Sequence, residues 1–159
     1  GEILTNLSNK KIAYKWPNDI LINKKKFAGI IIETSSNTKL NVKWAIIGIG
    51  INTKNYPKFK KIDFKATSLR KEGIFLENEF FLNLLINNFF NNYLDWKKNG
   101  FSKIKKKWLS SLYKKDNKII IKFNNKKYKG TFINLCNDGS LKVKINKDIK
   151  KLSFGNQLI

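Results

Sequence analysis

The chain has 159 residues, 42% hydrophobic and 13% aromatic, a folding composition that allows one domain with a core or a domain with a small module. It has no histidine and one cysteine, Cys136, which excludes Ser-His-Asp and Cys-His catalysis, an internal disulfide and a cysteine-rich zinc site. The formal net charge is +22, and no apolar run is long enough to span a bilayer.

The first part of the chain predicts short strands separated by turns. Pro17 cannot donate to a strand ladder and biases Trp16 to extended backbone, so residues 16–19 form a corner. Residues 23–25 suit a hairpin loop, and the apolar runs on either side of residues 34–41 predict buried strands, the first of them central in a sheet. In chain order, we expect the end of a helix at 2–9 and strands at 12–15, 20–22, 26–33 and 43–51.

The second part predicts two helices and then a β module. Apolar residues spaced by four, from Phe81 to Tyr93, indicate a helix over 77–98 that stops at Asn99-Gly100. A second helix is expected over 101–113. From Asp116 the period changes to two, which predicts a small barrel. Its expected strands are 118–123, 128–135, 141–145 and 150–154, with turns at Asn124-Asn125 and Asp138-Gly139 and a buried thiol at Cys136.

Three groups of residues stand out, and each has a structural explanation when taken alone. The Trp-Pro-Asn-Asp corner can be only a turn, with Asn18 and Asp19 bonding nearby backbone. Gly48 and Gly50 can be places where strands approach closely. The lysines at 24–26 can be a solvated hairpin tip.

Taken together, these residues resemble the biotin protein ligases. The resemblance is carried by their order and spacing, and it covers nearly the whole chain: Lys-Trp-Pro-Asn-Asp (15–19), Lys-Phe-Ala-Gly-Ile (26–30), Glu33, Gly-Ile-Gly-Ile-Asn (48–52) and Ala-Thr-Ser-Leu (66–69). It implies an α+β fold, with a mixed β-sheet that has helices packed on one side, followed by a small SH3-like β-barrel. The two domains are expected at 1–114 and 115–159.

The resemblance also implies that the chain is the C-terminal part of a longer ligase. The chain begins at Gly1 without a methionine, and its first residues already suit a helix. The family's glycine- and arginine-rich loop, which closes over biotin and the adenylate, precedes this helix and is not among the 159 residues. We therefore expect an N-terminally truncated version of the family fold.

The implied reaction has two steps and takes place in the cytoplasm. ATP, expected with Mg²⁺, and biotin give biotinyl-5′-AMP and pyrophosphate. A lysine of the biotin carboxyl carrier protein, a subunit of acetyl-CoA carboxylase, then attacks the acyl-adenylate. The partner supplies the nucleophile, so the chain needs no catalytic His, Ser or Cys. We expect no membrane partner and leave a homodimer open.

Lys26 is the expected catalytic residue. Strict alternation along the strand places Lys26, Ala28 and Ile30 on one face, with Phe27 and Gly29 on the other. A cation at the start of this strand can stabilise charge on the α-phosphate, whereas Lys24 and Lys25 are expected in solvent. The resemblance implies a substrate site of Lys26, Trp16, Asn18, Gly29, Ile30, Gly48, Gly50 and Asn52, supported by Lys15, Pro17, Asp19 and Glu33, with no metal ligands.

Two alternatives stay open. The first is a non-catalytic remnant whose basic β module binds polyanions or a protein partner. A nucleic-acid partner is disfavoured because Arg70 is the single arginine among 33 basic residues, whereas phosphate and base recognition usually use the bidentate guanidinium. Lys, Asn, Ile and Phe are encoded by A/T-rich codons, so the charge is explained by compositional drift. The second alternative is a lipoate-type acyl ligase.

Overall fold

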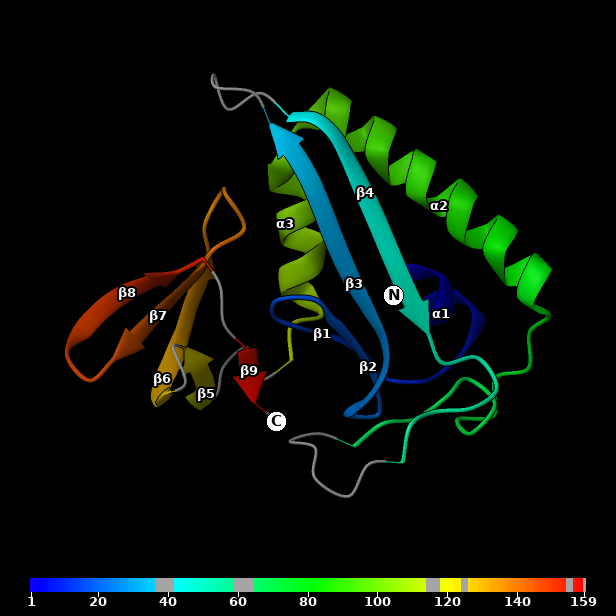
Figure 1. The fold of residues 1–159 in the computed structure, drawn as a ribbon, viewed down its shortest axis with the longest axis horizontal. Coiled ribbons are helices and arrows are strands. Elements are labelled where there is room, and N and C mark those ends of the chain that lie inside the picture. Colours follow the sequence, from blue (N-terminus) through cyan, green and yellow to red (C-terminus); the bar gives the residue numbers. More distant parts are fainter. Residues whose placement is uncertain (37–41, 59–64, 114–117, 124–125, 154–155, 159) are drawn as a thin grey trace.

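Figure 1 shows the computed structural model, which describes residues 1–36, 42–58, 65–113, 118–123, 126–153 and 156–158. The predicted turn at Asn124-Asn125 and the centre of the predicted domain boundary at 114–115 lie outside these ranges. In chain order the elements are α1 (Glu2–Leu7), β1 (Ile12–Lys15), β2 (Asp19–Ile22), β3 (Lys25–Ser36), β4 (Val42–Ile51), α2 (Asn78–Asn99), α3 (Phe101–Ser110), β5 (Lys118–Phe123), β6 (Lys126–Leu135), β7 (Leu141–Ile145), β8 (Asp148–Leu152) and β9 (Asn156–Leu158).

The first sheet is antiparallel and has the strand order β1-β2-β3-β4. Each strand follows the previous one through a short connection, and such connections join antiparallel neighbours. The expectation of a mixed sheet is therefore wrong for the described strands. Parallel pairing is limited there to isolated bridges, which join Tyr14 to Leu112 and Lys26 to Ala66.

Helices α1 and α2 pack against one face of this sheet (Figure 1). Phe81 of α2 is buried in a cluster with Leu4 of α1, and with Ile20 and Ala28 of the sheet. Gly100, at φ 73°, ends α2 where the sequence predicts the stop, because glycine adopts this left-handed conformation without strain. No helix in the described residues is long and apolar enough to cross a membrane.

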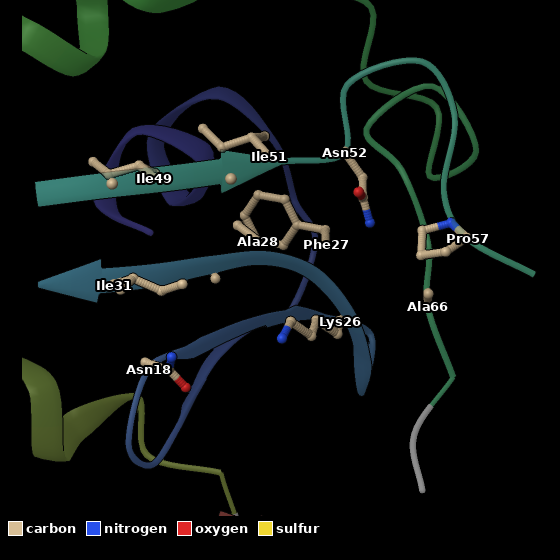
Figure 2. A pocket seen from close by; sticks show the side chains of 13 residues that line it. Asn18, Lys26, Phe27, Ala28, Ile31, Ile49, Ile51, Asn52, Pro57 and Ala66 are labelled. Atoms are coloured by element: carbon tan, nitrogen blue, oxygen red, sulfur yellow. The ribbon is translucent and has the colours of Figure 1, made fainter. Parts of the chain in front are cut away.

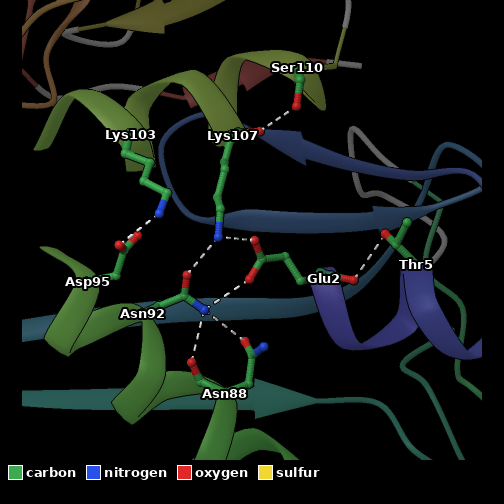
Figure 3. A network of polar contacts seen from close by, with 9 residues as sticks. Glu2, Thr5, Asn88, Asn92, Asp95, Lys103, Lys107 and Ser110 are labelled. Atoms are coloured by element: carbon green, nitrogen blue, oxygen red, sulfur yellow. Dashed lines mark hydrogen bonds and ion pairs between the residues drawn. The ribbon is translucent and has the colours of Figure 1, made fainter. Parts of the chain in front are cut away.

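A polar network joins the three helices (Figure 3). The Lys107 ammonium of α3 lies 2.8 Å from a Glu2 carboxylate oxygen of α1, and the Asn92 side chain of α2 donates to the other oxygen at 2.9 Å. Lys103 and Asp95 form a second contact between α3 and α2 at 2.8 Å. These contacts hold the three helices against one another.

Strand β4 is exposed, although its apolar sequence predicts burial. Trp44 is 50% exposed and Ile46 is 59% exposed. In the described residues β4 pairs only with β3, so it forms an edge of the sheet, and no described element covers the face opposite the helices. The apolar residues of β4 therefore lie partly on a sheet face that the described residues do not cover.

A β-bulge interrupts the pairing of β2 with β3. Ile20 pairs with Ala28 and Leu21 with Lys26, which leaves Phe27 as the extra residue. Phe27 and Ala28 are both buried in the core beneath the helices. Strict alternation is therefore wrong at this point, and Lys26 comes to the same face as Gly29.

The C-terminal strands form a second antiparallel sheet, in the order β8-β7-β6-β5-β9. Burial alternates along β7, as the period of two predicts, whereas the sequence did not predict β9. The described pairings leave β8 and β9 at the ends, so a closed barrel is not confirmed. The core of this sheet includes Trp16 and Leu112 from the first part of the chain, and Cys136 is partly exposed.

Candidate functional site

Three glycines form the floor of a pocket on the sheet face opposite the helices. Gly29 pairs with Gly50, and Ile31 with Gly48, so these residues share one face. A methyl group added at Gly48 or Gly50 would meet no protein atom closer than 3.8 Å. Packing within the protein therefore does not require glycine at either position, and what these glycines keep clear is the pocket itself.

The pocket has a volume of about 800 Å³, within the range of small-molecule sites (Figure 2). Lys26 and Asn18 lie on the β2 side of the floor, and Asn52 with Pro57 lies beyond the end of β4. The full lining is Asn18, Lys26, Phe27, Ala28, Gly29, Ile31, Gly48, Ile49, Gly50, Ile51, Asn52, Pro57 and Ala66.

Lys26 belongs to a cluster of three charges at the edge of this floor. Its ammonium lies 2.5 Å from one oxygen of Asp19, whose other oxygen lies 2.7 Å from the Lys15 ammonium. The Lys15 and Asp19 side chains are 5% and 7% exposed, whereas Lys26 is 28% exposed. Two cations share one carboxylate, so these three side chains carry a net positive charge, and the more exposed cation faces the pocket. Such a group suits an anionic ligand.

Asn18 and Asn52 bring amide groups to the pocket. The Asn18 side chain donates to the Ile30 carbonyl at 2.9 Å, and the Ile30 amide donates back to the Asn18 carbonyl. The Asn52 side chain donates to the Thr67 carbonyl at 2.9 Å. A primary amide has two N–H groups and one oxygen, and each of these bonds uses one N–H group. Both side chains are thus fixed by backbone contacts at the pocket wall.

The three consecutive lysines have different surroundings. Lys24, at φ 65°, is exposed in the turn between β2 and β3. The Lys25 ammonium lies 2.8 Å from the buried Glu72 carboxylate, so the expectation that Lys25 is only solvated is wrong. Lys26 contacts Asp19 and lines the pocket.

Glu72 is a buried carboxylate that accepts three side-chain hydrogen bonds. Lys25 and Thr67 donate to one oxygen at 2.8 and 2.6 Å, and Asn23 donates to the other at 2.8 Å. Burial alone raises the pKa of this carboxyl, but the hydrogen bonds and the Lys25 charge outweigh it and lower the pKa to about 2. Glu72 is therefore ionised at neutral pH.

The structure brings some of the predicted site residues together and leaves others elsewhere. Asn18, Lys26, Gly29, Gly48, Gly50 and Asn52 all line the pocket, and Lys15 and Asp19 support Lys26. Trp16 is 3% exposed in the core of the second sheet, where its indole N–H donates to the Gly139 carbonyl at 3.3 Å. Ile30 packs toward the helices, while Pro17 and Glu33 are exposed outside the lining.

Sequence reasoning missed several residues around the pocket. Phe27 and Ala28 line it although both are buried in the core beneath the helices, Pro57 comes from a polar loop without periodicity, and Ala66 opens the Ala-Thr-Ser-Leu segment. Glu72 carried a usable signal, because an acidic residue follows Ala-Thr-Ser-Leu in a lysine-rich chain. Within the described residues, no three Asp, Glu, Cys or His side chains gather to hold a metal.

The fold is that of enzymes that ligate biotin. A crystal structure of biotin protein ligase from Aquifex aeolicus aligns with a TM-score of 0.81 and 24% identity over 98% of this chain and 68% of that chain. The same enzyme in complex with biotin and ATP aligns with a TM-score of 0.78 and 24% identity over 98% of this chain and 65% of that chain. At this identity the likeness describes the fold alone.

Sequence comparison identifies the family. The model of the biotin/lipoate A/B protein ligase family matches residues 7–110, and the chain belongs to this family. The bifunctional ligase/repressor BirA of Bacillus subtilis (strain 168) is 33% identical over 87% of this chain and 43% of its own length. The biotin–[acetyl-CoA-carboxylase] ligase of Paracoccus denitrificans is 32% identical over 82% of this chain and 56% of its own length. The predicted resemblance is thus confirmed, and the chain spans about half the length of these relatives.

Proposed function

We propose that this chain is the part of a biotin protein ligase that carries the adenylation pocket. The observation behind the proposal is the arrangement of Lys26, held by Asp19, beside an open floor made by Gly29, Gly48 and Gly50. A flat backbone floor admits a ligand, and a fixed cation at its edge suits a phosphate. The names of the relatives point to the same chemistry.

In the first step, a carboxylate oxygen of biotin attacks the α-phosphorus of ATP. The bond from that phosphorus to the bridging oxygen breaks, which gives biotinyl-5′-AMP and pyrophosphate. Lys26 stabilises the negative charge that builds on the α-phosphate, and Asp19 keeps its ammonium in place without reorganisation during the reaction. Asn52 offers its amide to adenine. Mg²⁺ enters with ATP as part of the substrate.

In the second step, the ε-amine of a lysine on the biotin carboxyl carrier protein attacks the acyl carbon of the adenylate. An amide forms, AMP leaves with the electron pair of the broken bond, and the amine loses a proton. Within the described residues, β4 pairs with a neighbour on one side only. We therefore infer that the carrier adds a strand at the other edge of β4. A second copy of the chain is the alternative occupant of that edge.

The same proposal covers the C-terminal strands and the cover of the pocket. We assign residues 115–159 to an SH3-like domain and residues 1–114 to the catalytic domain. The glycine- and arginine-rich loop that covers biotin is supplied from outside these residues. The term intact ligase denotes this chain joined to that loop.

The test is biotin-dependent pyrophosphate release by the intact ligase, followed by transfer of biotin to a carrier domain, detected with streptavidin. The family model includes lipoate ligases, so lipoate must be offered in parallel. We expect turnover with biotin and little with lipoate. The reverse preference would assign the pocket to the lipoate-type reaction, and salt-sensitive binding of polyanions without turnover would support the non-catalytic alternative.

A further inference from the structure

The Glu72 carboxylate joins two segments that border the pocket, although it does not line the pocket itself. Asn23 and Lys25 belong to the hairpin that leads into Lys26, and Thr67 belongs to the segment after the loop that follows β4. Only an acceptor with two oxygens can receive all three donors, which makes an ionised carboxylate the fitting group.

Backbone hydrogen bonds carry this connection to Lys26. The Thr67 amide donates to the Lys26 carbonyl at 2.9 Å, and the Lys26 amide donates to the Lys65 carbonyl at 2.8 Å. Both the amide and the carbonyl of Lys26 are therefore bonded to residues 65–67, the segment that Glu72 fixes through Thr67. Its neighbour Lys25 is fixed by Glu72 directly.

The same segment holds Asn52 on the other side of the pocket. The Asn52 side chain donates to the Thr67 carbonyl at 2.9 Å, and the Leu69 amide donates to the Asn52 carbonyl at 2.9 Å. Thr67 thus contacts Glu72 through its hydroxyl, Lys26 through its amide and Asn52 through its carbonyl. The Thr67 side chain is fully buried, so this link is shielded from water.

We propose that Glu72 is a positioning residue of the adenylation reaction, which sets the distance between the Lys26 cation and the Asn52 amide through Thr67. The proposal rests on the proposed function, and it assigns to Glu72 a role in catalysis without contact with the substrate. Displacing a reacting group by about 1 Å can cost on the order of 100-fold in rate, so a loosened link reduces turnover even when the fold is kept.

The test combines a rate measurement on the intact ligase with amide hydrogen exchange on the 159-residue chain. Glu72→Gln keeps the size of the side chain but replaces one oxygen by an NH2 group. That group then faces either Asn23 or the pair Lys25 and Thr67, all of which are donors. We expect kcat for biotinyl-AMP formation to fall about 10- to 100-fold. Exchange should become faster at the amides of Lys26, Thr67 and Leu69, and stay unchanged at Ile121 in the second sheet.

Two further pairs of variants separate positioning from stability. Thr67→Val removes the hydroxyl at nearly constant shape and should lower kcat like Glu72→Gln, whereas Thr67→Ser keeps the donor and should retain most of the rate. Combining Thr67→Val with Glu72→Gln should add little to either change. Glu79→Gln, on the exposed first turn of α2, is the matched control and should leave kcat and exchange unchanged.

Each outcome decides the proposal. Faster exchange throughout the chain, or local exchange changes without a fall in kcat, would show that Glu72 is a stabilising residue only and would overturn the proposal. Unchanged exchange at Lys26, Thr67 and Leu69 would also overturn it. If the intact wild-type ligase formed no adenylate from biotin or lipoate, the proposed function would fall together with the catalytic role of Glu72, while the exchange data would still test the link itself.

Discussion

Replacing Lys26 with alanine should remove adenylation while leaving the fold intact. The Lys26 side chain is 28% exposed, and Asp19 also contacts Lys15 at 2.7 Å, a contact that we expect the variant to keep. No buried carboxylate is left unpaired, so we expect a loss of about 1 kcal/mol or less in the free energy of unfolding. Losing one preorganised charge donor in an active site costs roughly 100- to 1000-fold in rate, or about 3–4 kcal/mol of transition-state stabilisation.

The neighbouring lysines provide the controls. Lys24→Ala should change little, because this side chain is exposed in a turn. Lys25→Ala should have an intermediate effect, because its ammonium pairs with Glu72. Lys26→Arg should also lose most activity, since a planar guanidinium does not replace a compact ammonium between Asp19 and the floor at Gly29.

The assay is pyrophosphate release by the intact ligase, with circular dichroism and urea unfolding as checks on the fold. Similar rates for the alanine variants at 24, 25 and 26 would refute the reasoning, because the lysine cluster would then be only a soluble turn. Loss of folding in Lys26→Ala would refute the claim that Lys15 alone satisfies Asp19.

Three other predictions concern the chain more widely. Residues 1–159 alone should bind biotin weakly, because the loop that we propose to cover biotin is not among them and a ligand needs enclosure on several sides; submicromolar binding by calorimetry would contradict this. A bound carrier domain should cross-link to β4, for example to the new lysine of the variant Trp44→Lys. Cross-links confined to β5–β9 would argue against docking at the sheet edge. Because the folded-state pKa of Glu72 is lowered from 4.5 to about 2, its contribution to stability should be complete above pH 4.5 and decline as the pH falls toward 2. The wild type should therefore be more stable than Glu72→Gln in urea unfolding near pH 6, with the gap narrowing in acid, and a pH-independent gap would contradict the lowered pKa.

Most of the helices and strands could be predicted, because apolar spacing and turn residues are read within a few neighbouring positions of the sequence. The spacing of apolar residues predicted α2 to within a residue at each end, and the Asn99-Gly100 stop is where α2 ends. The alternation along β7 gave its bounds, since side chains of a strand alternate between faces. The order of the glycines and Asn52 after Lys26 led to residues that line one pocket.

The remaining features depend on contacts that no local pattern encodes. The bulge at Phe27 arises from the register of β2 against β3, so it reverses the expected face of Lys26 without any mark in the sequence. The exposure of Trp44 depends on which strands neighbour β4. The partners of Glu72 come from two distant segments, and a single carboxylate in the sequence does not reveal them.

The glycine floor has a consequence for how variants of this chain should be sorted. An alanine at Gly48 or Gly50 would touch no protein atom closer than 3.8 Å, so the folded chain has nothing to lose there by steric conflict. Its methyl group would occupy space that a substrate needs. A selection for solubility or heat resistance would therefore retain such variants, and only a screen for biotin transfer would remove them. The most informative positions of this pocket are those at which a side chain is missing.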